Sequence, residues 1–134
     1  MTRSKLALWI LLAVVVAIGA GYAWGAGGRR EVQRTLTGME LRADLAEARG
    51  HVLEARVALY NLNFGDASRH LEMSKRPLQQ LKARLRDDSR DDLGGNVDTA
   101  LVKVNEAQQL ANKLDQAANS RAGEALTALE PVKP

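Results

Sequence analysis

The stretch 31–64, EVQRTLTGMELRADLAEARGHVLEARVALYNLNF, predicts one long helix around which the rest of the chain is arranged. It contains no proline, and its apolar residues recur at alternating intervals of four and three positions, which is heptad spacing. One such row comprises Val32, Leu36, Met39, Ala43, Ala46, Gly50, Leu53, Val57, Tyr60 and Phe64. A second row comprises Leu41, Leu45, Ala48, Val52, Ala55, Leu59 and Leu62. Together the rows predict a wide apolar face for a bundle, on a helix about 50 Å long.

The long helix is expected to end within Asn-Phe-Gly-Asp at positions 63–66. Gly65 can adopt the left-handed conformation that ends a helix, and Asp66 is a good N-cap for the next one. A second helix over 66–86 keeps the apolar spacing, and Pro77 is expected to kink or restart it. Because the turn is short, the two helices should be antiparallel neighbours.

A third helix is predicted over 97–130, after a polar and glycine-containing loop over 87–96. Asn96 or Asp98 can cap its start, and Pro131 ends it. Its apolar positions again follow heptad spacing, so it completes the same kind of packed face.

The helical domain predicted over 29–130, before a short tail at 131–134, is an elongated antiparallel three-helix bundle built on a helical hairpin. Aromatic residues make up only 4% of the chain. The core must therefore consist of Leu, Val and Ala, a composition typical of thin helical bundles and coiled coils.

The N-terminal stretch 6–28 contains no charged side chain and follows a short basic tail at 1–5. As a helix it would reach roughly 34 Å, enough to cross a hydrocarbon core of ~30 Å. The sequence therefore predicts an all-α fold in which a single transmembrane helix precedes the bundle. A cleaved signal peptide is the alternative, but Trp9 and Trp24 near the ends of the stretch resemble interfacial belts and favour a retained signal anchor.

The charges around this stretch bear on its orientation. Arg3 and Lys5 favour a cytoplasmic N-terminus, whereas Arg29 and Arg30 on the other flank favour the opposite. The signal-like order of the segments leads us to expect an inner-membrane, single-pass protein of a bacterial envelope with a periplasmic helical domain. Small residues recur every fourth position at Ala13, Ala17, Gly21 and Gly25, which would let another membrane helix pack closely.

Composition excludes several classes of function. Lys and Arg total 19 and Asp and Glu 16, so the net charge is only +3, whereas a nucleic-acid binder usually carries a clustered excess. The basic run Lys75, Arg76, Lys82, Arg84 and Arg86 has no interleaved aromatic residue for base stacking. There is no cysteine, which excludes disulfides and thiolate metal sites.

The two histidines are predicted to be surface residues without a metal. With a turn near Gly65, His70 should lie level with Tyr60 rather than with His51. Glu54 is then the one potential metal ligand at helical spacing from His51, and two ligands do not make a metal site. The acidic loop places Asp87, Ser89, Asp91 and Asp98 at calcium-loop positions, but Asp92 stands where that loop needs glycine. No metal, cofactor, small-molecule substrate or catalytic group is predicted.

A row of amides on the third predicted helix is the strongest polar candidate for partner recognition, because amides at a helix margin can hydrogen-bond across an interface. It consists of Asn105, Gln109, Asn112, Gln116 and Asn119.

The hairpin also resembles one unit of a tetratricopeptide repeat over about 48–81. Phe64 precedes the small Ala67 by three positions and Leu71 follows four later, as in the second half of that motif. No second copy follows at the ~34-residue period, and the Trp-Leu-Gly pattern is absent. The resemblance implies protein binding.

These features predict a membrane-anchored, non-enzymatic scaffold that tethers protein partners, a second copy of itself included, at a membrane surface. A helical bundle that binds a small molecule and a coiled-coil spacer between envelope layers are the two alternatives. Breaks at Gly65 and at Gly94 favour a folded-back bundle over a continuous rod.

Overall fold

The computed structural model describes residues 3–133, and within α1 it describes side chains only at positions 9, 12–18, 21–22 and from 31 on. Over these residues the chain forms four helices, α1 (Arg3–Tyr60), α2 (Phe64–Asp87), α3 (Asp91–Asn112) and α4 (Ala117–Leu129). The all-α prediction is confirmed for these residues. The chain divides into two compact units, Met1–Thr37 and Gly38–Pro134, which are described separately.

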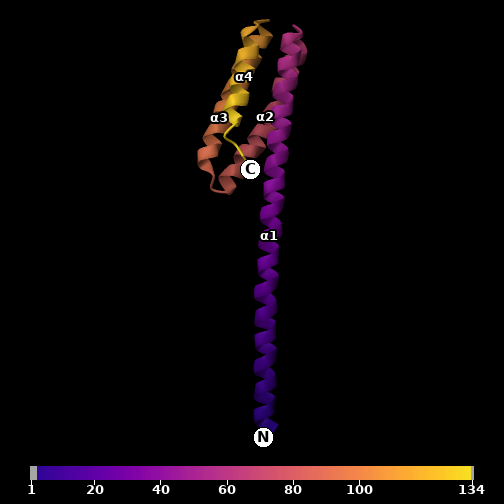
Figure 1. Ribbon diagram of the computed structural model, residues 1–134, viewed down its shortest axis with the longest axis vertical. Helices are drawn as coiled ribbons and strands as arrows, with labels where there is room; N and C mark the ends of the chain where they lie inside the picture. Colours follow the sequence, from indigo (N-terminus) through magenta and orange to yellow (C-terminus); the bar gives the residue numbers. More distant parts are fainter. Residues whose placement is uncertain (1–2, 134) are drawn as a thin grey trace. The chain divides into compact units, whose positions relative to one another are not determined.

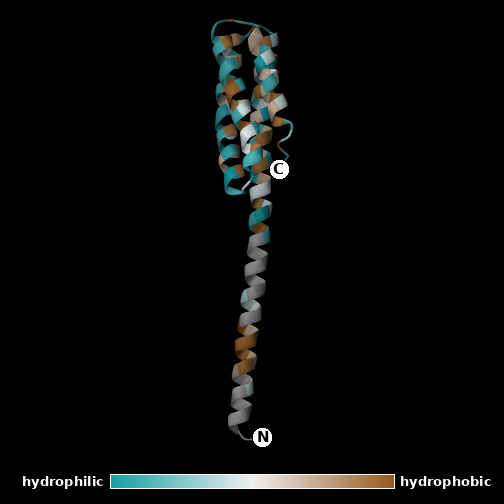
Figure 2. Cartoon of the chain, turned by 90° about the vertical axis from the view of Figure 1, so that its left-hand side faces the viewer, coloured by the Kyte–Doolittle hydropathy of each residue, from teal (hydrophilic) through white to brown (hydrophobic). Residues whose placement is uncertain are grey.

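Within the part of the chain that the structure describes, no helix is both long enough and apolar enough to cross a membrane. Residues 12–18 form a hydrophobic band on α1 (Figure 2). It lies on a helix that does not meet the requirements for a membrane span. The predicted transmembrane signal anchor over 6–28 is therefore wrong, and so are the membrane-helix part of the fold class and the inner-membrane, periplasmic localisation.

The second unit is an antiparallel bundle in which α2, α3 and α4 lie beside the C-terminal part of α1 (Figure 1). α2 packs on α3, and α3 packs on α4. The unit therefore contains four helical segments, and the predicted three-helix bundle is corrected in its number of helices.

Leucine, valine and alanine build the core of this unit, as its composition predicts. α1 contributes Leu41, Leu45, Ala48, Val52, Ala55, Ala58 and Leu59, and α2 contributes Ala67, Leu71, Leu78, Leu81 and Leu85. α3 adds Val97, Ala100, Val104, Ala107 and Ala111, and α4 adds Ala118, Ala122, Ala125 and Leu129. The many alanines allow the helices to approach closely, because a methyl group fills little of the space between two helix axes.

The two apolar rows of α1 differ in burial. The second row, which begins with Leu41 and Leu45, is buried as far as Leu59. The first row is exposed at each of its large residues from Val32 to Tyr60. The prediction that both rows form one buried face is therefore wrong: the rows lie on nearly opposite sides of the helix, since a shift of two residues turns a helix by about 200°.

All three helix connections use the same hydrogen-bond pattern, centred on a non-glycine residue with positive φ: Leu62 (58°), Ser89 (57°) and Leu114 (58°). At the first turn, the N–H of Asn63 donates to the carbonyl of Ala58 (2.8 Å) and that of Leu62 to Leu59 (3.0 Å). These paired bonds define a Schellman motif, which satisfies carbonyls at the end of a helix.

The Schellman motifs fall where the sequence prediction did not place them. Gly65 lies inside α2, and Asn63 rather than Asp66 caps that helix by accepting a hydrogen bond from the N–H of Asp66 (3.2 Å). The predicted loop over 87–96 is shorter in the structure, residues 88–90, because α3 already begins at Asp91. Acidic side chains in the first turn of α3 interact favourably with the helix dipole. The helix predicted over 97–130 is two helices, separated at Leu114.

Candidate functional site

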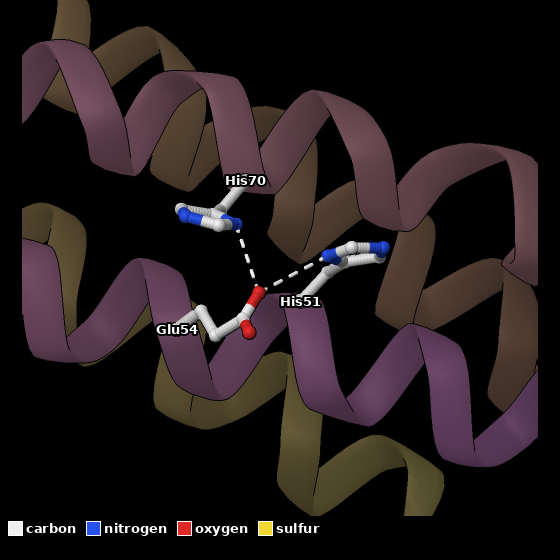
Figure 3. Close-up of side chains that lie close together, drawn as sticks. All are labelled: His51, Glu54 and His70. Carbon is white, nitrogen blue, oxygen red and sulfur yellow. Dashed lines mark hydrogen bonds and ion pairs between the residues drawn. The ribbon is translucent and has the colours of Figure 1, made fainter.

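His51 and Glu54 of α1 and His70 of α2 converge on the bundle surface (Figure 3). Oε2 of Glu54 lies 3.3 Å from Nδ1 of His51 and 2.9 Å from Nδ1 of His70. The two imidazole rings are 6.0 Å apart between centroids. One carboxylate oxygen therefore lies between two imidazole nitrogens that come from different helices.

The position of the turn explains why these residues meet. α1 ends at Tyr60 and α2 begins at Phe64, so Glu54 and His70 each lie six residues from the turn. Antiparallel helices place residues that are equally distant from the turn side by side. His51 is one helical turn before Glu54 and lies on the same face. The prediction that His70 lies level with Tyr60 is wrong because the turn centres on Leu62 instead of Gly65.

Both histidines are largely buried, with 18% and 19% of their side chains exposed. Nδ1 of His70 is inaccessible to solvent and makes no aligned hydrogen bond with the protein, although Glu54 Oε2 is only 2.9 Å away. The two atoms are close, but no hydrogen bond of acceptable geometry joins them. A buried polar atom without an aligned partner needs an explanation.

The second nitrogen of each ring faces another carboxylate. Nε2 of His51 lies 3.9 Å from Oε1 of Glu47, and Nε2 of His70 lies 3.8 Å from Oδ2 of Asp66. Each imidazole is thus placed between an inner carboxylate, Glu54, and an outer one of its own.

A surface cavity of about 420 Å³ opens beside this cluster. Its polar lining consists of Glu54, Asn61, Asn63, Asp66 and His70, and Leu53 and Val57 form part of its apolar lining. The cluster is therefore accessible to small solutes from one direction.

The exposed row of α1 forms a separate surface, which we call the outer row. Within the second unit it comprises Met39, Ala43, Ala46, Gly50, Leu53, Val57 and Tyr60. Leu53, Val57 and Tyr60 are 50%, 62% and 83% exposed. A Cβ added to Gly50 would meet no atom within 4 Å, so the middle of the row is flat and open.

Charged side chains of opposite sign border the outer row. Glu40, Glu47 and Glu54 follow its residues 39, 46 and 53, and Arg42, Arg49 and Arg56 precede its residues 43, 50 and 57. Arg49 donates to the carbonyl of Leu129 (2.6 Å) and Arg56 to the side chain of Asn119 (2.9 Å). The arginine border thus faces α4. The acidic border faces α2, where Glu40 pairs with Arg84.

The amide row predicted on one helix is divided between two. Asn105, Gln109 and Asn112 belong to α3, whereas Asn119 belongs to α4 and Gln116 precedes it. Asn112 accepts a hydrogen bond from Ser68 (2.8 Å), and Asn119 accepts one from Arg56 (2.9 Å). Two of the amides are therefore engaged within the bundle, and their role in partner recognition stays a prediction.

The small-residue row of α1 and the basic run of α2 form no site in the described part of the structure. Ala13, Ala17 and Gly21 are exposed on α1, while Gly25 lies outside the residues whose side chains are described. Their predicted role in packing presupposes a membrane helix, which is absent from the described part of the chain. In the basic run, Lys75 pairs with Glu72 and Lys82 with Asp98, so these cations are neutralised within the bundle.

Sequence reasoning missed the His51–Glu54–His70 cluster because it misplaced a turn by three residues. The available signal was local: His51 and Glu54 are separated by one helical turn, and His70 is as far past the loop as Glu54 is before it. No protein-family model, no curated protein and no solved structure matches the chain.

Proposed function

We propose that this chain is a non-enzymatic interaction module that pairs with a second copy of itself through the outer row of α1. The observation that carries the proposal is an exposed apolar row at heptad spacing with glutamates along one border and arginines along the other. Exposed apolar rows of this length are costly in water and mark contact surfaces.

The spacing of the outer row fits a helical partner. Alternating intervals of three and four residues keep the same face of a supercoiled helix toward its neighbour, so that each side chain can enter a hole on the other helix. The large residues Leu53, Val57 and Tyr60 lie at the C-terminal end of the row, and smaller residues lie between them and Met39. Ala43, Ala46 and Gly50 would bring the two helix axes close together.

The charged borders select the partner and its direction. In a parallel pair of identical helices, the arginine border of one copy faces the glutamate border of the other, for example Arg49 with Glu54. In an antiparallel pair, arginines would face arginines and glutamates would face glutamates, which is repulsive. The chain is therefore complementary to itself in a parallel arrangement.

Oligomeric state provides the first test. The full-length chain should be a dimer in sedimentation equilibrium at micromolar concentration, and Val57→Glu should shift it to monomer because it buries a charge in the apolar seam. Val102→Glu is the matched control, since Val102 is similarly exposed (53%) but lies on α3. A monomeric wild-type chain, or a Val57→Glu variant that associates like Val102→Glu, would contradict the proposal.

Disulfide cross-linking provides the second test, because the chain contains no cysteine of its own. A single Tyr60→Cys variant should cross-link to itself in a parallel, in-register pair. An antiparallel pair would instead cross-link a mixture of the Met39→Cys and Tyr60→Cys variants and leave each variant alone unlinked. That second pattern would refute the parallel arrangement.

A further inference from the structure

We propose that His51, Glu54 and His70 bind one divalent transition-metal ion, for which Zn²⁺ is the probe. The cluster shares Glu54 with the acidic border of the outer row, but its most informative variant, at His70, lies on α2 and outside that row. The argument rests on the donor atoms, their separations and the groups behind them.

The separations are close to those of a tetrahedral zinc site, which small side-chain rotations would complete. Zinc binds imidazole nitrogen and carboxylate oxygen at about 2.0–2.2 Å, so two ligand atoms on one tetrahedral ion are about 3.3–3.5 Å apart. Glu54 Oε2 lies 3.3 Å from one imidazole nitrogen and 2.9 Å from the other. All three ligand atoms lie within 4.8 Å of one another, so small side-chain rotations bring them around one ion.

Nδ1 of His70 supports a metal ligand over a simple hydrogen-bond donor. This nitrogen is inaccessible to solvent, faces the cluster and has no aligned hydrogen bond with the protein. An ion between the three residues would give its lone pair a partner. It would also place a positive charge beside the Glu54 carboxylate, which lies against the Nδ1 atoms of both histidines.

The outer carboxylates supply the usual second layer of a metal site. Histidines that bind metals commonly donate their other N–H to a carboxylate, which fixes the ring and its tautomer. Glu47 and Asp66 lie 3.9 and 3.8 Å from the Nε2 atoms of His51 and His70, close enough to form these bonds after a small rotation.

The cluster leaves one side open. Three protein ligands occupy three tetrahedral positions, and the cavity of about 420 Å³ beside Glu54 and His70 gives water access to the fourth. Two imidazoles with one carboxylate select ions such as Zn²⁺, Co²⁺ or Ni²⁺ over Mg²⁺ and Ca²⁺, which prefer all-oxygen ligands.

Calorimetric titration of the full-length, metal-free chain tests the proposal. One equivalent of Zn²⁺ per chain should bind and raise the Tm, whereas Mg²⁺ should do neither. His70→Gln and His51→Gln should each abolish the stoichiometric binding. Glu130→Gln, which removes an exposed carboxylate at the end of α4, should leave it unchanged. Circular dichroism of each variant without metal separates a lost ligand from a lost fold.

Two further measurements separate a built site from adventitious binding. Asp66→Asn should weaken Zn²⁺ binding about 10- to 100-fold, the range for second-layer partners. Co²⁺ should show the visible absorption of a four-coordinate ion in the wild-type chain and lose it in His70→Gln. Equal Zn²⁺ affinity in wild type and His70→Gln would overturn the proposal, and so would half an equivalent bound between two chains.

Discussion

The two apolar rows of α1 belong to the same helix and have the same heptad spacing, yet one is core and the other is surface. The buried row, with Leu45 and Val52 at its centre, contacts the other helices of the bundle. The outer row, with Leu53 and Val57, faces away from them. Adjacent positions such as Val52 and Leu53 therefore have opposite environments.

This contrast shows that apolar periodicity identifies a face that can be buried without identifying its partner. The short turns fix where α2 and α4 lie around α1, and this placement determines which row of α1 is buried. A polar contact reinforces the choice: Asp44, only 8% exposed, accepts a hydrogen bond from Nε of Arg84 on α2 (2.8 Å). Outer-row residues such as Leu53 and Val57 stay exposed instead.

The largest expected effect is the difference in the free energy of unfolding between substitutions in the two rows. Leu45→Ala should reduce the free energy of unfolding by about 2–5 kcal/mol, because it leaves a cavity in a closely packed core. Leu53→Ala removes the same atoms from a half-exposed position and should change it by less than about 1 kcal/mol. Urea denaturation followed by circular dichroism measures both.

Protein concentration must be varied in that experiment, since loss of pairing also lowers the stability of a dimer. The Leu45→Ala deficit should persist at every concentration, whereas any Leu53→Ala deficit should disappear on dilution. Comparable deficits at high dilution would show that the outer row is part of the fold rather than a free surface.

The small residues of the two rows give a second, smaller contrast. Ala48→Leu should destabilise the chain by about 1–3 kcal/mol, because Ala48 is fully buried and the core has no room for three more carbons. Gly50→Ala should instead stabilise it by up to about 1 kcal/mol, since the added methyl meets no atom and alanine favours the helix. Thermal unfolding of the two variants should therefore shift the Tm in opposite directions.

The sequence was sufficient to predict the helical class, the aliphatic core and the antiparallel hairpin, because these follow from heptad spacing and composition. It was insufficient for the helix ends. Leu62 and Leu114 occupy left-handed positions that usually select glycine, while Gly65 and Gly95 lie inside helices. Rules based on glycine therefore misplaced the breaks, because here local Schellman bonds end the helices with leucine in the left-handed position.

The candidate site depended on the same detail. Moving the turn from Gly65 to Leu62 shifts α2 along α1 by several residues, which brings His70 opposite Glu54 instead of Tyr60. The outer row was recognised as apolar and heptad-spaced, but its exposure could not be predicted, because burial depends on which of two similar faces the partner helices cover. Contacts between helices are thus far more sensitive to turn position than the helices themselves.

The smallest expected effect concerns the surface charges that join α3 and α4, in contrast to the apolar core beneath them. Glu124 accepts a hydrogen bond from Arg121 (2.7 Å) and pairs with Lys103 (3.2 Å). These contacts, the Arg121 hydrogen bond above all, lower the pKa of Glu124 from its ordinary value of 4.5. The pKa of Lys103 is raised from 10.5, mainly by its hydrogen bond to Glu106.

The direction of these shifts fixes the pH range of the effect. Because the folded chain holds the Glu124 proton less tightly than the unfolded chain, the stabilisation is complete above pH 4.5 and is lost as pH falls through the lowered pKa. Glu124→Gln should therefore lower the Tm slightly at pH 7, and the two proteins should converge as the pH falls from 4.5 through the lowered pKa. The shift should be smaller than that of Leu45→Ala, since both side chains of the Arg121–Glu124 pair are over 40% exposed. A gap that persists in acid would mean that Glu124 stabilises the α3–α4 contact by packing rather than by charge.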